Sequence, residues 1–393
     1  MKRLLILVAV LLCGVATAQN EYQEIARLRR MNETVRGIRS MADGEHYTVL
    51  ERGDIRRYQY ALKSEGQSLL PESARHIEIT DYCFSPDEQQ ILIASGTSPI
   101  YRHSYTTSYH LVSNGRIEPI MTEAEAPRDA AFSPDGRQII YSDRNNLWIY
   151  DIASRKSRAL TTDGAWNEVI NGTTDWVYEE EFGKTVAYAF SPDSREVAFL
   201  RFDESRVPEF QMMRFDGKLY NEAYSFKYPK AGEANSIVEL WTIDLTTGQK
   251  RKIDTGRETD QYIPRLGYTP DGRLWYFRLN RRQNVFEMVV CEHSGAQHVA
   301  YEERARQYVE RVDDQTITFI DKNRFIVRQE SHTGYMHLYL YTVRGGLQGP
   351  ITRGEWEVTD IVGTDGKRVW YLSTEPSPLR RALYSIRIDG KDI

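Results

Sequence analysis

One short peptide recurs along this chain and constrains its fold more than any other feature. It is a Ser/Thr-Pro-Asp turn that follows an aromatic residue and precedes a short β-branched or aromatic run. The clear copies are DYCFSPDEQQILIAS from Asp81, DAAFSPDGRQIIYSD from Asp129, AYAFSPDSREVAFLR from Ala187 and RLGYTPDGRLWYFRL from Arg265, and weaker copies begin at Ser40, Thr318 and Ile361.

The spacing of these turns gives the period of the repeat. Their aspartates are Asp43, Asp87, Asp135, Asp193, Asp271, Asp321 and Asp365. Successive aspartates are 44, 48, 58, 78, 50 and 44 residues apart. A period in the forties that is built from short strands is typical of a β-propeller, with one four-stranded blade in each repeat. The sequence therefore predicts an all-β fold, a β-propeller with about seven four-stranded blades.

The residues of the turn explain why it recurs. Proline presets φ for a tight turn, aspartate bonds to backbone further along, and a following glycine supplies a positive φ. The flanking runs alternate or are wholly apolar over four to six residues, as half-buried and central strands are. Most repeats then carry a second hairpin, for example ELWTIDLTTGQKRKI from Glu239. Two hairpins in each repeat account for the four strands of a blade.

Composition limits the possible partners. A net charge of −5 and a pI near 6.0 give no reason to expect a nucleic acid or an acidic membrane surface as a partner. No run after residue 20 is long and apolar enough to span a bilayer. We therefore expect no nucleic acid partner and no membrane span.

The N-terminus has the features of a secretory signal. A basic start at Lys2 and Arg3 precedes an apolar stretch that ends in small residues, so residues 1–18 are expected to be removed before Gln19. The protein is then exported, to a bacterial periplasm or outside the cell, with a segment 19–38 ahead of a propeller over 39–393. Cys83 and Cys291 lie in strands of different repeats, which favours two free thiols over a disulfide.

Two long steps between turns mark insertions, at about residues 165–185 and 203–238. Loops on a rigid scaffold carry most binding residues, so function is sought there. The first insertion contains Glu179, Glu180 and Glu181 in a row, bracketed by apolar and aromatic residues. Such a run can be a solvated charged turn. The apolar bracket instead favours a site for an ammonium group, which two carboxylates satisfy better than one.

A second candidate is Arg102, in SPIYRHSYTTSYHLV from Ser98 at the join of two strands. An arginine in a loop is usually solvated. If it lies near the glutamates it would offset their repulsion and could donate to a substrate carbonyl.

These segments resemble motifs of dipeptidyl peptidase IV, a serine exopeptidase of the prolyl oligopeptidase family. DWVYEEEF from Asp175 resembles its double-glutamate motif, RHSYTTSY from Arg102 its arginine segment, and YPKAGEAN from Tyr228 a third motif. The three occur in the family's order, and the resemblance extends from about residue 25 to the end of the chain.

The resemblance implies roles for particular residues. Glu180 and Glu181 would bind the free N-terminus of a peptide, and Arg102 would contact the backbone carbonyl of the penultimate residue. Dipeptides with Pro or Ala second would be released. Residues 203–235 resemble an arm that helps homodimers form, with apolar residues such as Val207, Phe210, Met212 and Met213 expected to be available to a second subunit. The family's Arg-Phe-Arg contact strip is not kept in VERVDD from Val309, where only Arg311 survives.

The residues that would perform the chemistry are not found. The family's nucleophile lies in a Gly-x-Ser-x-Gly motif of an α/β-hydrolase domain, and no such motif occurs in the 393 residues. The family's propeller also has eight blades, against seven turn signatures here. We therefore expect no catalytic residue, no α/β-hydrolase domain and no activity in this chain, which looks like the N-terminal portion of a longer protein.

Other sites and functions are less well supported. The histidines at 103, 110, 332 and 337 are spaced too loosely on strands to indicate a metal site, and we expect neither metal nor cofactor. A non-enzymatic periplasmic propeller scaffold of the Tol-system type would explain the Ser-Pro-Asp turns equally well. That alternative gives no reason for DWVYEEEF or YPKAG.

Overall fold

The computed structural model describes residues 22–27, 37–62, 65–310 and 312–391. The expected signal peptide at 1–18, most of the segment 19–38, and Arg311 lie outside these ranges. The chain divides into two compact units, Met1–Ile77 and Glu78–Ile393. Within the described residues no helix is long and apolar enough to cross a membrane.

The described residues of the first unit form an antiparallel sheet of four strands, in sequence order. Residues 22–27 are helical and precede the sheet. The elements of the sheet and the short 3-10 helix after it are β1 (Arg39–Ser40), β2 (His46–Glu51), β3 (Asp54–Gln59), β4 (Gln67–Ser68) and η1 (Glu72–Ala74).

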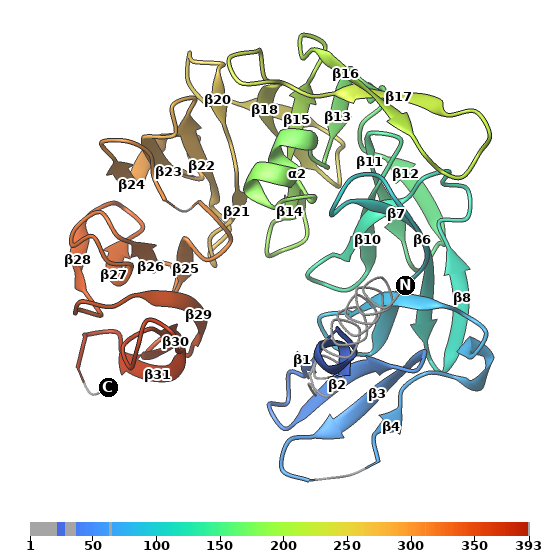
Figure 1. Ribbon diagram of the computed structural model, residues 1–393, viewed down its shortest axis with the longest axis horizontal. Coiled ribbons are helices and arrows are strands. Elements are labelled where there is room, and N and C mark those ends of the chain that lie inside the picture. The colour runs from blue at the N-terminus through green and yellow to red at the C-terminus, as the bar shows by residue number, and fades with distance from the viewer. Residues whose placement is uncertain (1–21, 28–36, 63–64, 311, 392–393) are drawn as a thin grey trace, which may run out of the picture. The chain divides into compact units, whose positions relative to one another are not determined.

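Besides a separate two-stranded hairpin, the described residues of the second unit form six sheets that follow one another around an arc (Figure 1). The first two are β5 (Ile79–Phe84), β6 (Gln90–Pro99), β7 (Tyr105–Ser113), β8 (Arg116–Ile120), and β9 (Arg128–Phe132), β10 (Gln138–Asp143), β11 (Asn146–Asp151), β12 (Lys156–Ala159). The third contains β13 (Val169–Asn171), β14 (Tyr188–Phe190), β15 (Glu196–Asp203), β18 (Ile237–Asp244) and β19 (Lys250–Ile253). In it β13 and β14 both pair with β15.

The remaining sheets repeat this plan. The fourth contains β20 (Gln261–Tyr262), β21 (Leu266–Tyr268), β22 (Leu274–Asn280), β23 (Val285–Cys291) and β24 (Gln297–Arg304). The fifth contains β25 (Ile317–Phe319), β26 (Arg324–Gln329), β27 (His337–Thr342) and β28 (Leu347–Pro350), and the sixth β29 (Val358–Thr364), β30 (Arg368–Ser373) and β31 (Ala382–Arg387). Among the described residues there are thus seven blade sheets, which confirms the predicted β-propeller of four-stranded blades.

The Ser-Pro-Asp turns adopt the predicted local structure. The Ser85 hydroxyl donates to Asp87 Oδ1 at 2.6 Å, and the Gln90 amide donates to Ser85 Oγ at 2.9 Å. The same hydroxyl–carboxylate bond occurs in Ser133–Asp135, Ser191–Asp193 and Thr269–Asp271. The next residue has a positive φ in each turn, namely Glu88 (57°), Gly136 (70°), Ser194 (59°) and Gly272 (85°).

The core lies between neighbouring sheets. Ile139 and Ile140 are adjacent in β10, and their side chains point to opposite faces of its sheet. Ile139 packs in a cluster with residues of β6 and β7, and Ile140 packs in another with residues of β15. Because a blade is covered on both faces, its central strands are apolar at successive positions rather than at alternate ones.

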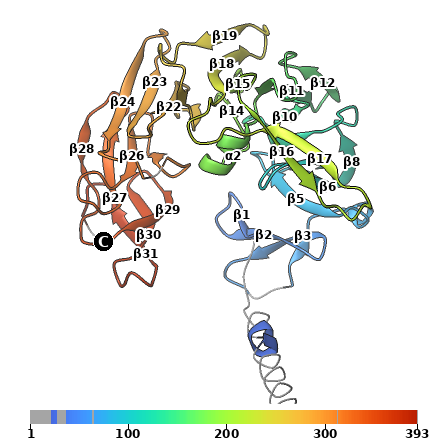
Figure 2. The ribbon, with the colours of Figure 1, turned by 45° about the horizontal axis from the view of Figure 1, so that its top comes forward.

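Both insertions contain structure of their own. The first contains a short helix, α2 (Trp176–Phe182), and the second contains a two-stranded hairpin of β16 (Glu209–Arg214) and β17 (Glu222–Lys227). Figures 1 and 2 show the hairpin projecting away from its blade. Its end exposes several large side chains, which are Met212, Met213, Phe215, Leu219 and Tyr220.

The expectation that Val207 and Phe210 are available to a partner is wrong in detail. Val207 is only 4% exposed. The Phe210 ring is half-buried against Phe226 and Tyr228 at the base of the hairpin. Cys83 and Cys291 are not joined by a disulfide, as predicted, and Cys291 is buried whereas Cys83 is half-buried.

Candidate functional site

The three consecutive glutamates lie on α2, a helix with defined ends. Its N-cap is Asp175, whose carboxyl accepts a hydrogen bond from the Tyr178 amide at 3.0 Å. Its C-cap is Gly183, in the left-handed conformation with φ of 58°. The Arg265 guanidinium donates to the Phe182 carbonyl at 2.8 Å, so one of the last carbonyls of the helix has a charged donor. These are the groups that a short helix needs at its two ends.

Buried contacts fix the orientation of α2 on the propeller. The Asp175 carboxyl also accepts from the Ser236 hydroxyl at 2.6 Å, and burial raises its pKa above the usual range. The Tyr178 hydroxyl accepts from the Ile263 amide at 2.7 Å, while its ring meets Phe202 edge-on at 4.8 Å. Figures 1 and 2 show α2 on the inner side of the arc of sheets.

Glu179 is fully buried and contacts the segment that contains Arg102. Its Oε1 accepts hydrogen bonds from the amides of His103 at 2.7 Å and Ser104 at 2.9 Å. Its Oε2 has no partner among the described residues. The first acid of the run is therefore an internal support, a role that its place in the sequence did not indicate.

Glu180 forms an ion pair with Arg102. Arg102 Nε lies 3.2 Å from Glu180 Oε2. The Glu180 side chain is 13% exposed, whereas that of Arg102 is 73% exposed. Two of the predicted site residues, 78 positions apart in the sequence, are thus in contact. The arginine keeps most of its guanidinium open to a ligand.

Glu181 is exposed and faces a cavity of about 480 Å³. The cavity is lined by aromatic side chains together with the cations Lys230 and Arg281. Its lining residues are Trp176, Val177, Glu181, Phe182, Tyr228, Pro229, Lys230, Ala231, Asn235, Tyr262, Arg281 and Gln283. The Tyr-Pro-Lys-Ala motif is therefore a wall of the space that Glu181 faces.

The hairpin β16–β17 is packed against both parts of the site. The ring of Tyr101, next to Arg102, lies 5.7 Å from that of Phe226 in β17. The ring of Trp176, at the start of α2, lies 4.3 Å from that of Tyr228. The arginine segment and the helix are therefore in contact with the base of the same hairpin.

The strip at 309–314 lies near the C-terminal end of α2. Asp314 Oδ1 accepts from Arg265 Nε at 2.6 Å and from Lys184 Nζ at 3.2 Å. Burial alone would raise the pKa of Asp314, but these two cations hold the pKa below its usual range. Arg311 lies outside the described residues, so the structure leaves its predicted contact open.

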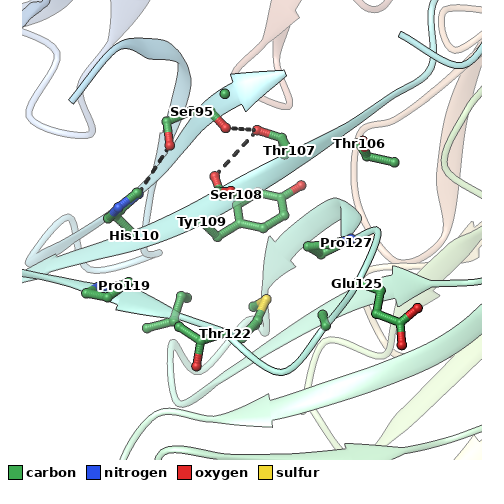
Figure 3. Close-up of a pocket in the computed structure, with 14 residues that line it drawn as sticks. Ser95, Thr106, Thr107, Ser108, Tyr109, His110, Pro119, Thr122, Glu125 and Pro127 are labelled. Atoms are coloured by element: carbon green, nitrogen blue, oxygen red, sulfur yellow. Dashed lines mark hydrogen bonds between the residues drawn. The ribbon is translucent and has the colours of Figure 1, made fainter. Parts of the chain in front are cut away.

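Within the described part of the chain, neither the histidines nor the other cavities form a rival site. No group of three His, Cys, Asp or Glu side chains there could hold a metal ion. His337 Nε2 donates to the Gly354 carbonyl at 2.9 Å, its Nδ1 lies 3.0 Å from the Thr352 hydroxyl, and burial lowers its pKa. A cavity of about 530 Å³ at β7 and β8 (Figure 3) is lined by small hydroxyl side chains and His110 and contains none of the predicted site residues.

The structure brings two of the predicted site residues together and shows supports that the sequence did not indicate. Arg102 and Glu180 are brought together, and Glu181 follows on the same helix. Asp175, Tyr178 and Glu179 were missed as structural anchors. An Asp three residues before a helical amide is an N-cap signature that could have located α2. No local signal could have identified the partners of Glu179.

Comparisons with known proteins agree with this geometry. A family model described as the dipeptidyl peptidase IV (DPP IV) N-terminal region matches residues 85–393. The crystal structure of Porphyromonas gingivalis dipeptidyl peptidase 4 superposes with a TM-score of 0.87 at 36% identity. That match covers 94% of this chain and 54% of the other.

Curated relatives of similar sequence are also dipeptidyl peptidases by name. The inactive dipeptidyl peptidase 10 of Rattus norvegicus is 31% identical over 330 residues, which cover 79% of this chain and 42% of the relative. The probable dipeptidyl peptidase 4 of Emericella nidulans is 30% identical over 393 residues, which cover 93% and 50%. The chain thus spans about half the length of the curated relatives that it matches.

Proposed function

The chain belongs to the dipeptidyl peptidase IV family, and from this membership we propose that it is the substrate-recognition propeller of an exported serine exopeptidase. Glu180 and Glu181 bind the free N-terminus of a peptide, and Arg102 contacts the backbone carbonyl of the penultimate residue. The enzyme then releases N-terminal dipeptides with Pro or Ala second. The acyl-transfer chemistry belongs to a hydrolase domain with a serine nucleophile.

The observation that carries this proposal is the contact between Arg102 and Glu180, with Glu181 on the next position of a capped helix. An ammonium group has three donors and no acceptor, so it needs more than one oxygen. Two carboxylates on one short helix supply them, and the guanidinium beside them balances part of the charge. Together they bind an amine and a carbonyl at a fixed separation, which is how a dipeptide end is recognised.

The non-enzymatic scaffold of the Tol-system type gains no support from these contacts. A structural propeller needs no exposed arginine held beside two acids on a short helix. Family membership also favours the peptidase, although one relative is named an inactive dipeptidyl peptidase. A binding measurement therefore tests the proposal more directly than a test of hydrolysis by this chain.

The test is the affinity of the purified chain for Ala-Pro amide, measured by calorimetry against N-acetyl-Ala-Pro amide. The free amine should bind and the acetylated peptide should not, because acetylation removes the charge that the glutamates recognise. Glu180→Gln or Glu181→Gln should cost about 2–5 kcal/mol of binding free energy, since a desolvated ammonium loses a charged partner. That corresponds to a loss of at least about 30-fold in affinity.

Glu125→Gln is the matched control, because it removes one charge and breaks an exposed ion pair with Arg144. Its affinity should equal that of the parent. Equal binding of the free and acetylated peptides, or parental affinity in both glutamate variants, would rule out the amine site.

The hairpin β16–β17 is also proposed as a homodimer contact of the whole peptidase. Support comes from Phe215 and Leu219, which are 80% and 91% exposed, since apolar side chains gathered on a protruding element usually mark an interface. Replacing both with serine should halve the mass of the whole peptidase in light scattering. Leu379→Ser, at a residue 94% exposed outside the hairpin, should leave the mass unchanged. An undiminished mass in the double variant would remove this proposal.

A further inference from the structure

The first glutamate of the run has a position that differs from those of its two neighbours. Glu179 is fully buried, and its carboxyl spans from α2 to the turn between β6 and β7. This turn is closed by a hydrogen bond from the Ile100 amide to the Ser104 carbonyl at 2.8 Å. Its last two amides, of His103 and Ser104, both donate to Glu179 Oε1.

Arg102 depends on this turn for its position. Its side chain is 73% exposed, so apart from its ion pair with Glu180 the path of the backbone decides where the guanidinium lies. The residue before it, Tyr101, is packed on Phe226, and the two residues after it are bound by Glu179. The turn therefore has one apolar anchor and one polar anchor, and only the polar anchor is on α2.

The polar anchor, Glu179, directly precedes the ammonium-binding acids Glu180 and Glu181 on α2. Because a helix is rigid over one turn, the position of Glu179 fixes the positions of Glu180 and Glu181 relative to it. By bonding two main-chain amides of the turn, Glu179 also fixes the backbone that carries Arg102. One carboxyl thus links both halves of the recognition site without facing the ligand.

We infer that Glu179 is the positioning residue that sets the separation between the ammonium-binding glutamates and Arg102. This inference rests on the proposed function, since that separation is the length over which a peptide end is recognised. Replacing Glu179 should displace Arg102 and weaken the peptide contact made by the arginine. It should leave the two acids on α2 able to bind an amine.

Glu179→Ala removes the acceptor of both amides and is the main test. The readout is the Nε–H resonance of Arg102 in the peptide-free chain labelled with ¹⁵N-arginine, identified by its loss in Arg102→Lys. In Glu179→Ala this resonance should shift or broaden. Affinity for Ala-Pro amide should fall about tenfold, the factor expected for loss of one hydrogen bond from a charged donor. Glu179→Gln retains an oxygen for both amides and should restore the parental resonance and most of the affinity.

A control separates positioning from general damage to the helix. Tyr178→Phe also removes the acceptor of a main-chain amide, that of Ile263, from the same helix. It should lower the melting temperature but leave the Arg102 resonance in place. If Glu179→Ala does not fold, Glu179→Asp withdraws the carboxyl by one methylene and should move the resonance in the same direction.

The final test of the inference is whether the effects of two substitutions on peptide affinity add. If Glu179 acts through Arg102, combining Glu179→Ala with Arg102→Lys should weaken peptide binding no further than Arg102→Lys alone. A folded Glu179→Ala chain with the parental Arg102 resonance would overturn the inference, and so would fully additive losses. A parent chain that does not bind Ala-Pro amide would refute the proposed function, while the resonance of the peptide-free chain would still decide the positioning role.

Discussion

Glu204 should make the stability of this protein fall as pH rises towards 8. It follows β15 at the start of the second insertion and is only 6% exposed. Burial raises its pKa from 4.5 to about 8, and the nearby charges of Asp175 and Asp203 add to the effect, whereas Lys227 opposes it. The folded protein therefore holds a proton on Glu204 at pH values where the unfolded chain has lost it.

The sign and size of the change in the free energy of unfolding follow from this difference in the pKa of Glu204. Between about pH 4.5 and 8 the folded state binds more protons than the unfolded state, so the free energy of unfolding falls as pH rises. One pKa unit corresponds to about 1.36 kcal/mol, so a rise from 4.5 to about 8 corresponds to an upper limit of about 5 kcal/mol. The contribution is fully present below pH 4.5 and lost above about 8.

Glu204→Gln removes the titrating group and keeps the shape of the side chain. Urea unfolding at about pH 5, 6.5 and 8 should show that the variant gains stability relative to the parent as pH rises, by up to about 4 kcal/mol over these three pH units. Asp314→Asn is the control, because the pKa of Asp314 lies below its usual range, and that group is ionised throughout the window. It should give a constant offset. Parallel curves for Glu204→Gln and the parent would refute the reasoning.

Two further predictions concern the residue after the aspartate of each Ser-Pro-Asp turn. Gly136 has φ of 70°, and an added Cβ would meet no atom closer than 3.6 Å, so Gly136→Ala should cost about 1 kcal/mol from backbone conformation alone. Glu88 has φ of 57° at the equivalent position, so Glu88→Gly should raise the free energy of unfolding by up to about 1 kcal/mol. Urea denaturation measures both changes, and a Gly136→Ala protein as stable as the parent would contradict the first. A Glu88→Gly protein less stable than the parent would contradict the second.

Much of the fold could be predicted because its determinants are local and repeated. Each Ser-Pro-Asp turn satisfies its own hydrogen bonds within five residues, as Ser85, Asp87 and Gln90 show. The apolar runs beside the turns indicate strands covered on both faces. These features need no knowledge of distant contacts, so the period of the turns was enough to predict seven blades.

The sequence also singled out the glutamate run as a candidate site, because ammonium binding needs acids in apolar surroundings and the motif supplies them. It did not distinguish the three acids from one another. The sequence treated Glu179 as one of three similar acids and placed Val207 among the exposed residues, although both are buried. No local pattern distinguishes a buried glutamate from an exposed one beside it.

Only the tertiary structure decided which acid does what. Successive residues of α2 point in different directions, so the rotation of the helix determines that Glu179 faces inward, Glu180 faces Arg102 and Glu181 faces the cavity. That rotation is set by three contacts, of Asp175 with Ser236, of Tyr178 with Ile263 and of Phe182 with Arg265, in which each partner lies outside the helix. The sequence determined the blades through interactions between near neighbours, whereas the site depends on buried contacts between segments that only the folded propeller brings together.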